Sequence, residues 1–160
     1  MGSKLHEQAI VVDGLIISNF TRAVFEDMRR GGLTAANCTC SIWEGFRPSM
    51  ENVARWKAHF RDNADLITQV FTTADIHRAK REGRTGVILG WQNIAGIEDQ
   101  IAFLRLFKDL GVGVMQMAYN TQNLVGSGCY GKHDGGLWEF GHDGGEGRNA
   151  VGILWGLPHA

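Results

Sequence analysis

The sequence predicts an α/β fold in which a parallel β-sheet is covered by helices. Two observations lead to this expectation: short β-branched apolar runs, and stretches between them whose apolar residues recur at helical spacing. The two patterns alternate along all 160 residues, and no tandem repeat or low-complexity linker separates them. Strands that alternate with amphipathic helices are typical of a parallel sheet. We therefore expect one domain over residues 1–160.

Apolar runs predict the strands in chain order. The first run is β-branched and ends at Asp13-Gly14, where we expect a turn. The second consists of small residues and continues towards Ile42-Trp43, while the fourth is the clearest strand of the chain. The expected strands are residues 9–13, 33–39, 67–71, 86–91 and 112–118.

Cap residues and glycines delimit the helices between these strands. Asn19 or Thr21 is expected to cap the first, and Ser49 the second. Thr72 with Asp75 resembles a capping box that opens the third. The expected helices are residues 21–30, 49–65, 72–82 and 97–110, and a glycine follows the first, third and fourth.

Composition excludes several classes of function. The net charge of -1 provides no basic field for a phosphate backbone, so we expect no nucleic-acid partner. The apolar stretches are shorter than the roughly 20 residues of a membrane helix, so no membrane span is expected. Residues 1–7 lack the apolar core of a signal peptide, and three cysteines are too few for a disulfide framework. These features predict a cytoplasmic protein.

The carboxyl ends of parallel strands are where such sheets carry their functional residues. The long loop at residues 119–130 follows one of these ends and is rich in amides and hydroxyls. It can bind a peptide or small amide through Tyr119, Asn120 and Asn123, or it can be a solvated loop held by local Asx turns.

Two further groups of residues have candidate chemistry. Cys38 and Cys40 are separated by one residue, which favours a buried pair over a zinc chelate. Glu44 follows a strand end and is the best-placed carboxylate, either for acid-base chemistry or as a solvent-facing group.

Beyond these patterns, the order of motifs resembles the membrane dipeptidase (renal dipeptidase-like, M19) family of zinc hydrolases. The matching segments are residues 11–14, 31–33, 90–93, 110–112, 119–121, 134–137, 140–141, 149–154 and 157–159. The resemblance spans nearly the whole chain and about the first half of a family member. It implies a partial (β/α)8 barrel of about four βα units, whose open edge predicts aggregation or dimerisation.

The family resemblance also implies two zinc ions that activate water for attack on a dipeptide. The family's first-strand His and Asp ligands are replaced here by Leu15 and Ile17, and its bridging Glu by Gln92. Tyr119 stands in place of a substrate-polarising His, so His159 and Gln92 are the remaining metal candidates. We expect a dipeptidase-like hydrolase of dipeptides or small amides, inactive as this chain alone.

Alternatives to this hydrolase remain at the sequence level. One is a non-catalytic barrel derivative that binds a peptide or small amide through residues 119–130. A flavodoxin-like domain is disfavoured because the segment after Asp13-Gly14 is too apolar for a phosphate loop. In addition, the glycines of residues 144–147 fall where the family has an amphipathic helix, which predicts a poorly formed helix there.

Overall fold

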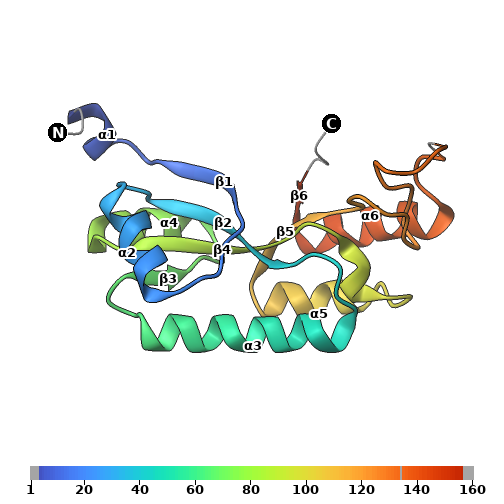
Figure 1. The fold of residues 1–160 in the computed structure, drawn as a ribbon, viewed down its shortest axis with the longest axis horizontal. Coiled ribbons are helices and arrows are strands. Elements are labelled where there is room, and N and C mark those ends of the chain that lie inside the picture. The colour runs from blue at the N-terminus through green and yellow to red at the C-terminus, as the bar shows by residue number, and fades with distance from the viewer. Residues whose placement is uncertain (1–3, 134, 157–160) are drawn as a thin grey trace.

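The computed structural model describes residues 4–133 and 135–156. Its helices are α1 (Lys4–Gln8), α2 (Arg22–Arg30), α3 (Phe46–Asp62), α4 (Thr73–Glu82), α5 (Phe103–Asp109) and α6 (Glu139–Val151), with a 3-10 turn at Ile94–Ile97. Its strands are β1 (Val12–Ile16), β2 (Ala35–Ser41), β3 (Ile67–Gln69), β4 (Thr85–Trp91), β5 (Val112–Gln116) and β6 (Leu154–Gly156). Figure 1 shows the long helix α3 lying beneath the sheet.

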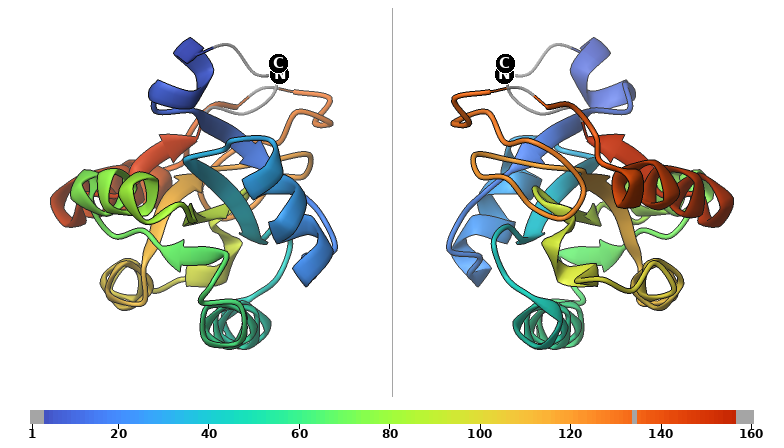
Figure 2. Two further views of the ribbon diagram at one scale, coloured as in Figure 1. Left: turned by 90° about the vertical axis from the view of Figure 1, so that its left-hand side faces the viewer. Right: turned by 90° about the vertical axis from the view of Figure 1, so that its right-hand side faces the viewer.

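All the strand pairs are parallel, and the sheet order is β1-β2-β4-β5-β6. The short β3 pairs with the start of β4, on the edge that β5 occupies further along. Figure 2 shows the strands on an arc with helices on its outer side and an opening towards the chain termini. This curved βα arrangement is a partial (β/α)8 barrel, as expected.

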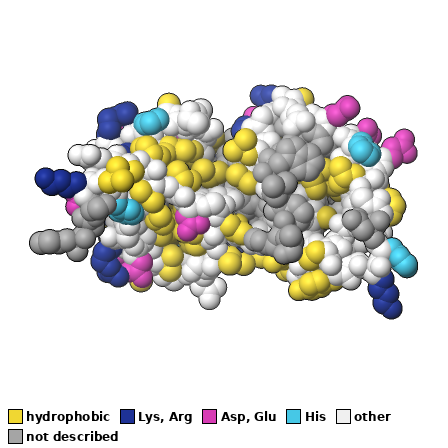
Figure 3. Space-filling view, turned by 90° about the horizontal axis from the view of Figure 1, so that it is seen from above, with side chains coloured by type: hydrophobic (Ala, Val, Ile, Leu, Met, Phe, Trp, Pro, Cys, Tyr) yellow, Lys and Arg dark blue, Asp and Glu magenta, His cyan; other side chains and the backbone are white. Residues whose placement is uncertain are grey.

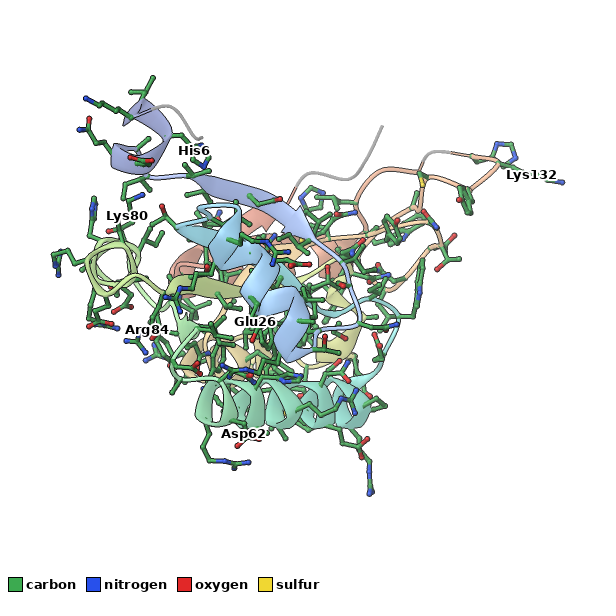
Figure 4. All side chains as sticks on the ribbon, turned by 60° about the vertical axis from the view of Figure 1, so that its left-hand side comes forward. His6, Glu26, Asp62, Lys80, Arg84 and Lys132 are labelled. Carbon is green, nitrogen blue, oxygen red and sulfur yellow. The ribbon has the colours of Figure 1, made fainter. Side chains whose placement is uncertain are left out.

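The main core fills the space between the outer face of the arc and the helices. Phe25 from α2, Trp56 from α3 and Phe107 from α5 are almost completely buried against outward-facing strand residues. The strands supply Cys38, Leu89 and Met115 to this cluster. Charged side chains lie at the periphery, and Asp62 and Lys132 point away from the sheet (Figure 4).

Most of the predicted helix signals are confirmed. Thr21 is the N-cap of α2, and Thr72 with Asp75 forms the predicted capping box of α4. Gly83 ends α4 with φ of 64°, a left-handed conformation that glycine adopts without a steric penalty. The fourth expected helix is shorter than predicted, because a 3-10 turn at Ile94–Ile97 precedes α5.

Several element boundaries differ from the sequence prediction, most clearly at β1 and α3. Asp13-Gly14 lies inside β1, where Asp13 pairs with Ala36 of β2, so the expected turn is wrong. Helix α3 begins at Phe46, ahead of Ser49, because Pro48 is tolerated in a first turn that needs no amide hydrogen there. The carboxylate of Glu98 accepts a hydrogen bond from the Phe46 N–H at 2.9 Å and supplies the missing cap.

Helix α6 is continuous despite its glycines, contrary to the expectation of a poorly formed helix. A β-carbon at Gly147 would lie 2.8 Å from Ile101 Cγ2, and one at Gly141 would lie 2.1 Å from the Val125 carbonyl oxygen. Glycine therefore allows α6 to approach its neighbours more closely than any other residue would. This close packing offsets the low helix propensity of the segment.

Candidate functional site

A cavity of about 430 Å³ lies on the concave face of the sheet. Seen from above, this side of the molecule carries a group of hydrophobic side chains (Figure 3). Alternate residues line the cavity from β5 and β6, whereas β1 contributes four consecutive residues beside its register shift. The cavity is lined by Val12, Asp13, Gly14, Leu15, Asn37, Ile88, Trp91, Gln92, Val114, Gln116, Leu154 and Gly156.

Three buried carboxamides give this cavity its polar character. In each of them the amide nitrogen donates a hydrogen bond to the protein: Asn37 to the Gly14 carbonyl at 2.9 Å, Gln92 to Thr39 Oγ1 at 2.9 Å and Gln116 to the Ala118 carbonyl at 2.8 Å. Of their oxygens, Asn37 Oδ1 is buried and has no hydrogen-bond partner within the described part of the chain. The three amides are thus fixed by their nitrogen ends.

Asn37 makes the tightest of these contacts with the sheet. It is 92% buried, and its Oδ1 atom has no hydrogen-bond partner within the described part of the chain. A β-carbon at Gly90 would lie only 1.9 Å from this oxygen, so the carboxamide rests on bare backbone of β4. The Asn37 side chain of β2 therefore contacts Gly14 of β1 on one side and Gly90 of β4 on the other.

Asp13 is the only charged residue that lines this cavity in the described chain. Its Oδ1 accepts a hydrogen bond from the Leu15 N–H at 3.0 Å, which fixes the carboxylate beside β1. Leu15 also lines the cavity, whereas Ile17 lies beyond the end of β1 and is 63% exposed. The register pairs Asp13 with Ala36 of the helix-covered core, so its side chain lies on the outer face, and the site combines three amides with aliphatic walls.

These residues do not fit the dinuclear zinc centre that the resemblance implies. Zinc binds thiolate, imidazole and carboxylate groups, whereas Leu15 and Ile17 are hydrocarbons and the neutral amide of Gln92 donates to Thr39. Among the described residues, no three His, Cys, Asp or Glu side chains are grouped so as to hold a metal. His159, the other metal candidate, lies outside the described residues.

The three loop residues predicted to bind substrate do not line this cavity. Asn123 donates to Asn93 Oδ1 and to the Met117 carbonyl, and its Oδ1 accepts from the Val125 and Gly126 amides. All four hydrogen-bonding positions of its amide are thus used to hold the loop. The hydrogen bonds of Asn123 thus match the alternative expectation, in which local Asx turns hold the loop.

Tyr119 and Asn120 lie elsewhere in the same loop. The Tyr119 ring packs on Trp43 with a centroid distance of 5.1 Å, and Asn120 Oδ1 accepts a hydrogen bond from the Cys129 thiol at 3.3 Å. A second cavity, of about 440 Å³, adjoins this loop and has mainly apolar walls. Substrate binding by Tyr119, Asn120 and Asn123 stays a prediction.

Glu44 organises the carboxyl end of β2. Its Oε2 atom accepts hydrogen bonds from Ser41 Oγ and from the Ile42 and Trp43 amides, at 2.6–3.0 Å. Burial alone would raise the pKa of this carboxyl group, but these hydrogen bonds outweigh it and the pKa is lowered. Glu44 is therefore a carboxylate that holds the loop after β2 through hydrogen bonds.

The paired cysteines are buried, as predicted, and all three cysteines are free. Burial raises the pKa of the Cys38 and Cys40 thiols to about 12, with a smaller contribution from Asp13 for Cys38. Such thiols stay protonated at neutral pH, so they are poor zinc ligands and poor nucleophiles.

Sequence reasoning missed Asn37 and Gln116 as residues of the site. Each lies within a mainly apolar or small-residue strand, and the sequence has no motif that distinguishes them from core positions. The one available signal is strand alternation: a polar residue in a buried strand must face either a partner or a cavity.

Solved structures similar to this chain share its fold. An amidohydrolase from Pseudomonas aeruginosa is 53% identical in sequence and superposes with a TM-score of 0.94. The match covers 96% of this chain and 47% of the amidohydrolase. The probable dipeptidase PvdM from the same organism is 16% identical, with a TM-score of 0.82. This match covers 96% of the present chain and 48% of PvdM.

A third similar structure is a metallo peptidase from Rhodobacter sphaeroides liganded with a phosphinate mimic of the dipeptide L-Ala-D-Ala. It is 13% identical, with a TM-score of 0.76 over 91% of this chain and 57% of its own. The present chain thus spans about half the length of the solved structures that it matches. Residues 8–160 match the model of the membrane dipeptidase family, and the chain therefore belongs to that family, peptidase family M19.

Proposed function

We propose that this chain carries the small-amide binding face of a dipeptidase-like, amidohydrolase-type barrel and does not hydrolyse dipeptides by itself. Family membership and 53% identity to an amidohydrolase support the substrate class. A cavity of about 430 Å³ is within the usual range for small-molecule sites, which combine apolar walls with a few placed polar groups. Asn37, Gln92 and Gln116 are these polar groups.

We expect this chain to be inactive on its own because its side chains at the zinc-ligand positions cannot coordinate zinc. The single observation that carries it is that Leu15 and Gln92 line the cavity at the positions of zinc ligands. A hydrocarbon donates no electron pair, and a carboxamide does not neutralise two dications. A zinc-dependent reaction of the whole protein would therefore need zinc held chiefly by other groups, with His159 as the remaining imidazole candidate.

A restoration experiment tests this assignment. The unmodified chain should bind less than one zinc per molecule and should not hydrolyse alanylalanine, whereas Leu15→His, Ile17→Asp and Gln92→Glu together should gain bound zinc. The matched control places the same residue types on the surface, as Leu106→His, Ile10→Asp and Gln100→Glu, and should gain none. Zinc-dependent hydrolysis by the unmodified chain, lost in His159→Ala, would refute the proposal.

The alternative function, binding of a peptide through residues 119–130 without catalysis, has weaker support. Asn123 uses its amide to hold the loop, and Tyr119 packs on Trp43. Replacing Tyr119 with Phe should leave small-amide affinity unchanged if the cavity is the binding site. A loss of affinity in this variant would favour the loop.

Two expectations about the chain's surroundings also remain proposals. Strands β1 and β6 end the described sheet order, and Val12 and Leu154 are 50% and 67% exposed. Such edges favour pairing between two copies of the chain, so Leu154→Lys should lower the mass measured by analytical ultracentrifugation.

No helix in the described residues is long and apolar enough to cross a bilayer. A cytoplasmic location is supported by the three free cysteines.

A further inference from the structure

A third cavity, of about 380 Å³, lies between residues 18–21, at the start of α2, and residues 52–59 of α3. This α2–α3 cavity shares none of its described lining residues with the concave cavity. Figure 4 faces this side of the molecule, with α2, which carries the labelled Glu26, drawn above α3. The described lining combines three hydroxyls, two carboxamides, a guanidinium and an imidazole with two aromatic rings, and it includes no carboxylate.

Arg55 brings a positive charge to this cavity. Its Nη2 atom donates to Asn52 Oδ1, a neutral acceptor, and Arg55 forms no ion pair with a carboxylate of the described residues. Glu44 is linked to Arg55 through Asn52, whose Nδ2 donates to Glu44 Oε1 at 3.5 Å, but Glu44 does not line the cavity. Because a guanidinium has five N–H donors, most of them remain for a ligand.

Trp56 adds a donor of a different kind. The residue is only 4% exposed, and its indole nitrogen has no hydrogen-bond partner in the described chain. The side-chain atoms that are wholly buried without a partner there are Asn37 Oδ1 and Trp91 Nε1, so Trp56 Nε1 keeps some accessible surface. Since Trp56 lines the α2–α3 cavity, this N–H is available to a molecule bound there. An indole nitrogen can only donate.

The remaining polar groups can also donate. Thr39 Oγ1 accepts a hydrogen bond from Gln92 Nε2 at 2.9 Å, so its single O–H is left to donate. The His59 ring lies edge-on to Trp56, with a centroid distance of 5.5 Å, and an imidazole has an N–H in either charge state. The first turn of α2 has no acidic side chain, and the start of a helix favours negative charge.

We propose that the α2–α3 cavity binds a small oxyanion, a phosphate or carboxylate group, through Arg55, Trp56 and Thr39. The N–H fork of a guanidinium matches two oxygens of such a group, and the indole N–H and the hydroxyl donate to the same anion. The Phe20 ring, whose centroid lies 4.6 Å from that of Trp56, provides an apolar wall for the part of the ligand that carries the anion. This site is separate from the concave cavity, so the inference does not depend on the proposed function.

NMR titrations of the full chain with sodium phosphate, at an ionic strength held constant with sodium chloride, test the proposal. The indole N–H signal of Trp56 and the side-chain N–H signals of Arg55 should shift and reach saturation. The indole signal of Trp91, whose nitrogen is wholly buried, should not shift. Sodium chloride alone should not reproduce the changes.

Acetate and acetamide are a matched pair that tests whether the charge is recognised. Acetate should shift the Trp56 signal, whereas acetamide, which has a similar shape and no charge, should not. Tighter binding of phosphate than of acetate identifies a phosphate ester as the ligand class, and the reverse order identifies a carboxylate. Acetamide binding as tightly as acetate would overturn the proposal.

Charge-matched variants assign the binding to this cavity. Because a hydrogen bond to a charged group is stronger than one between neutral groups, Arg55→Gln should weaken phosphate binding about tenfold or more. Arg81→Gln removes the same charge from an exposed position of α4 and should leave the affinity unchanged. Thr39→Val removes the hydroxyl donor at similar size and should weaken binding by a smaller factor, which keeps the test valid if the Arg55 variant does not fold.

Two results would contradict the assignment. Equal phosphate affinity of the Arg55→Gln and Arg81→Gln variants would show that the anion binds outside this cavity. A Trp56 shift that sodium chloride produces as strongly as phosphate would show a general effect of salt. Either result would leave the small-amide site on the concave face unaffected.

Discussion

The two faces of the sheet have different tasks, although the same strands form both. Leu89 faces the helices, is fully buried and belongs to a continuous apolar core. Its neighbour Ile88 faces the concave cavity and is only partly buried. The outer face is closed by side chains from α2, α3 and α5, whereas the inner face carries acceptor groups with few partners.

This difference teaches where stability and recognition are located in the chain. Burial of apolar surface is the main source of folding free energy, and most of it is found on the outer face. Partly satisfied polar groups are costly, and on the inner face Asn37 has a buried oxygen without a partner in the described chain. Variants on the outer face, on the inner face and at the carboxyl rim test this division.

Removing adjacent side chains of β4 should have unequal effects. Leu89→Ala should lower the free energy of unfolding by about 2–5 kcal/mol, because it leaves a cavity in a closed core. Ile88→Ala should cost clearly less, since part of this side chain is already accessible from the cavity. Urea unfolding of both variants measures the difference. Equal losses would show that the two faces contribute equally to stability.

On the inner face, we expect an added side-chain atom to lower the free energy of unfolding where it meets the Asn37 carboxamide. Gly90→Ala places a β-carbon 1.9 Å from Asn37 Oδ1 and should cost about 1–3 kcal/mol. Gly14→Ala, where no atom lies within 4 Å of the added carbon, is the matched control and should be near neutral.

A double-mutant cycle identifies the cause of the Gly90 effect. If the clash with the carboxamide is responsible, the variant with both Gly90→Ala and Asn37→Ala should be more stable than additivity predicts. Additive losses would place the clash elsewhere and would weaken the claim that Gly90 holds Asn37 in place.

The sequence predicted the architecture well because the fold depends on repeated local signals. The capping box at Thr72 and Asp75 and the apolar run at β4 are read without knowledge of tertiary structure. The boundary of α3 was missed because its cap comes from Glu98, which lies 52 residues after Phe46 in the chain. A cap that comes from another element leaves no local pattern.

The site was only partly predictable for a related reason. Gln92 was found through its place in a family motif, and the same comparison showed that Leu15 and Ile17 cannot bind zinc. Asn37 and Gln116 were missed, because a polar residue in a strand becomes a site residue only when neighbouring strands face it across a cavity. The hydrogen bonds of Asn123 hold its loop, and the substrate-binding role expected for this residue stays a prediction.

The smallest predicted effect concerns acid stability at the carboxyl rim, between the two faces. Glu44 has a lowered pKa because hydrogen bonds from Ser41, Ile42 and Trp43 outweigh the effect of burial. A carboxylate whose pKa is lower folded than unfolded stabilises the protein above its unfolded pKa, about 4.3. This contribution is lost as the pH falls through the lower, folded-state value. Glu44→Gln should therefore show a shallower loss of unfolding free energy on acidification, measured by urea titrations across this range. Glu51→Gln, in an exposed pair with Arg47, should keep the original slope, and identical slopes in all three proteins would contradict the role of Glu44.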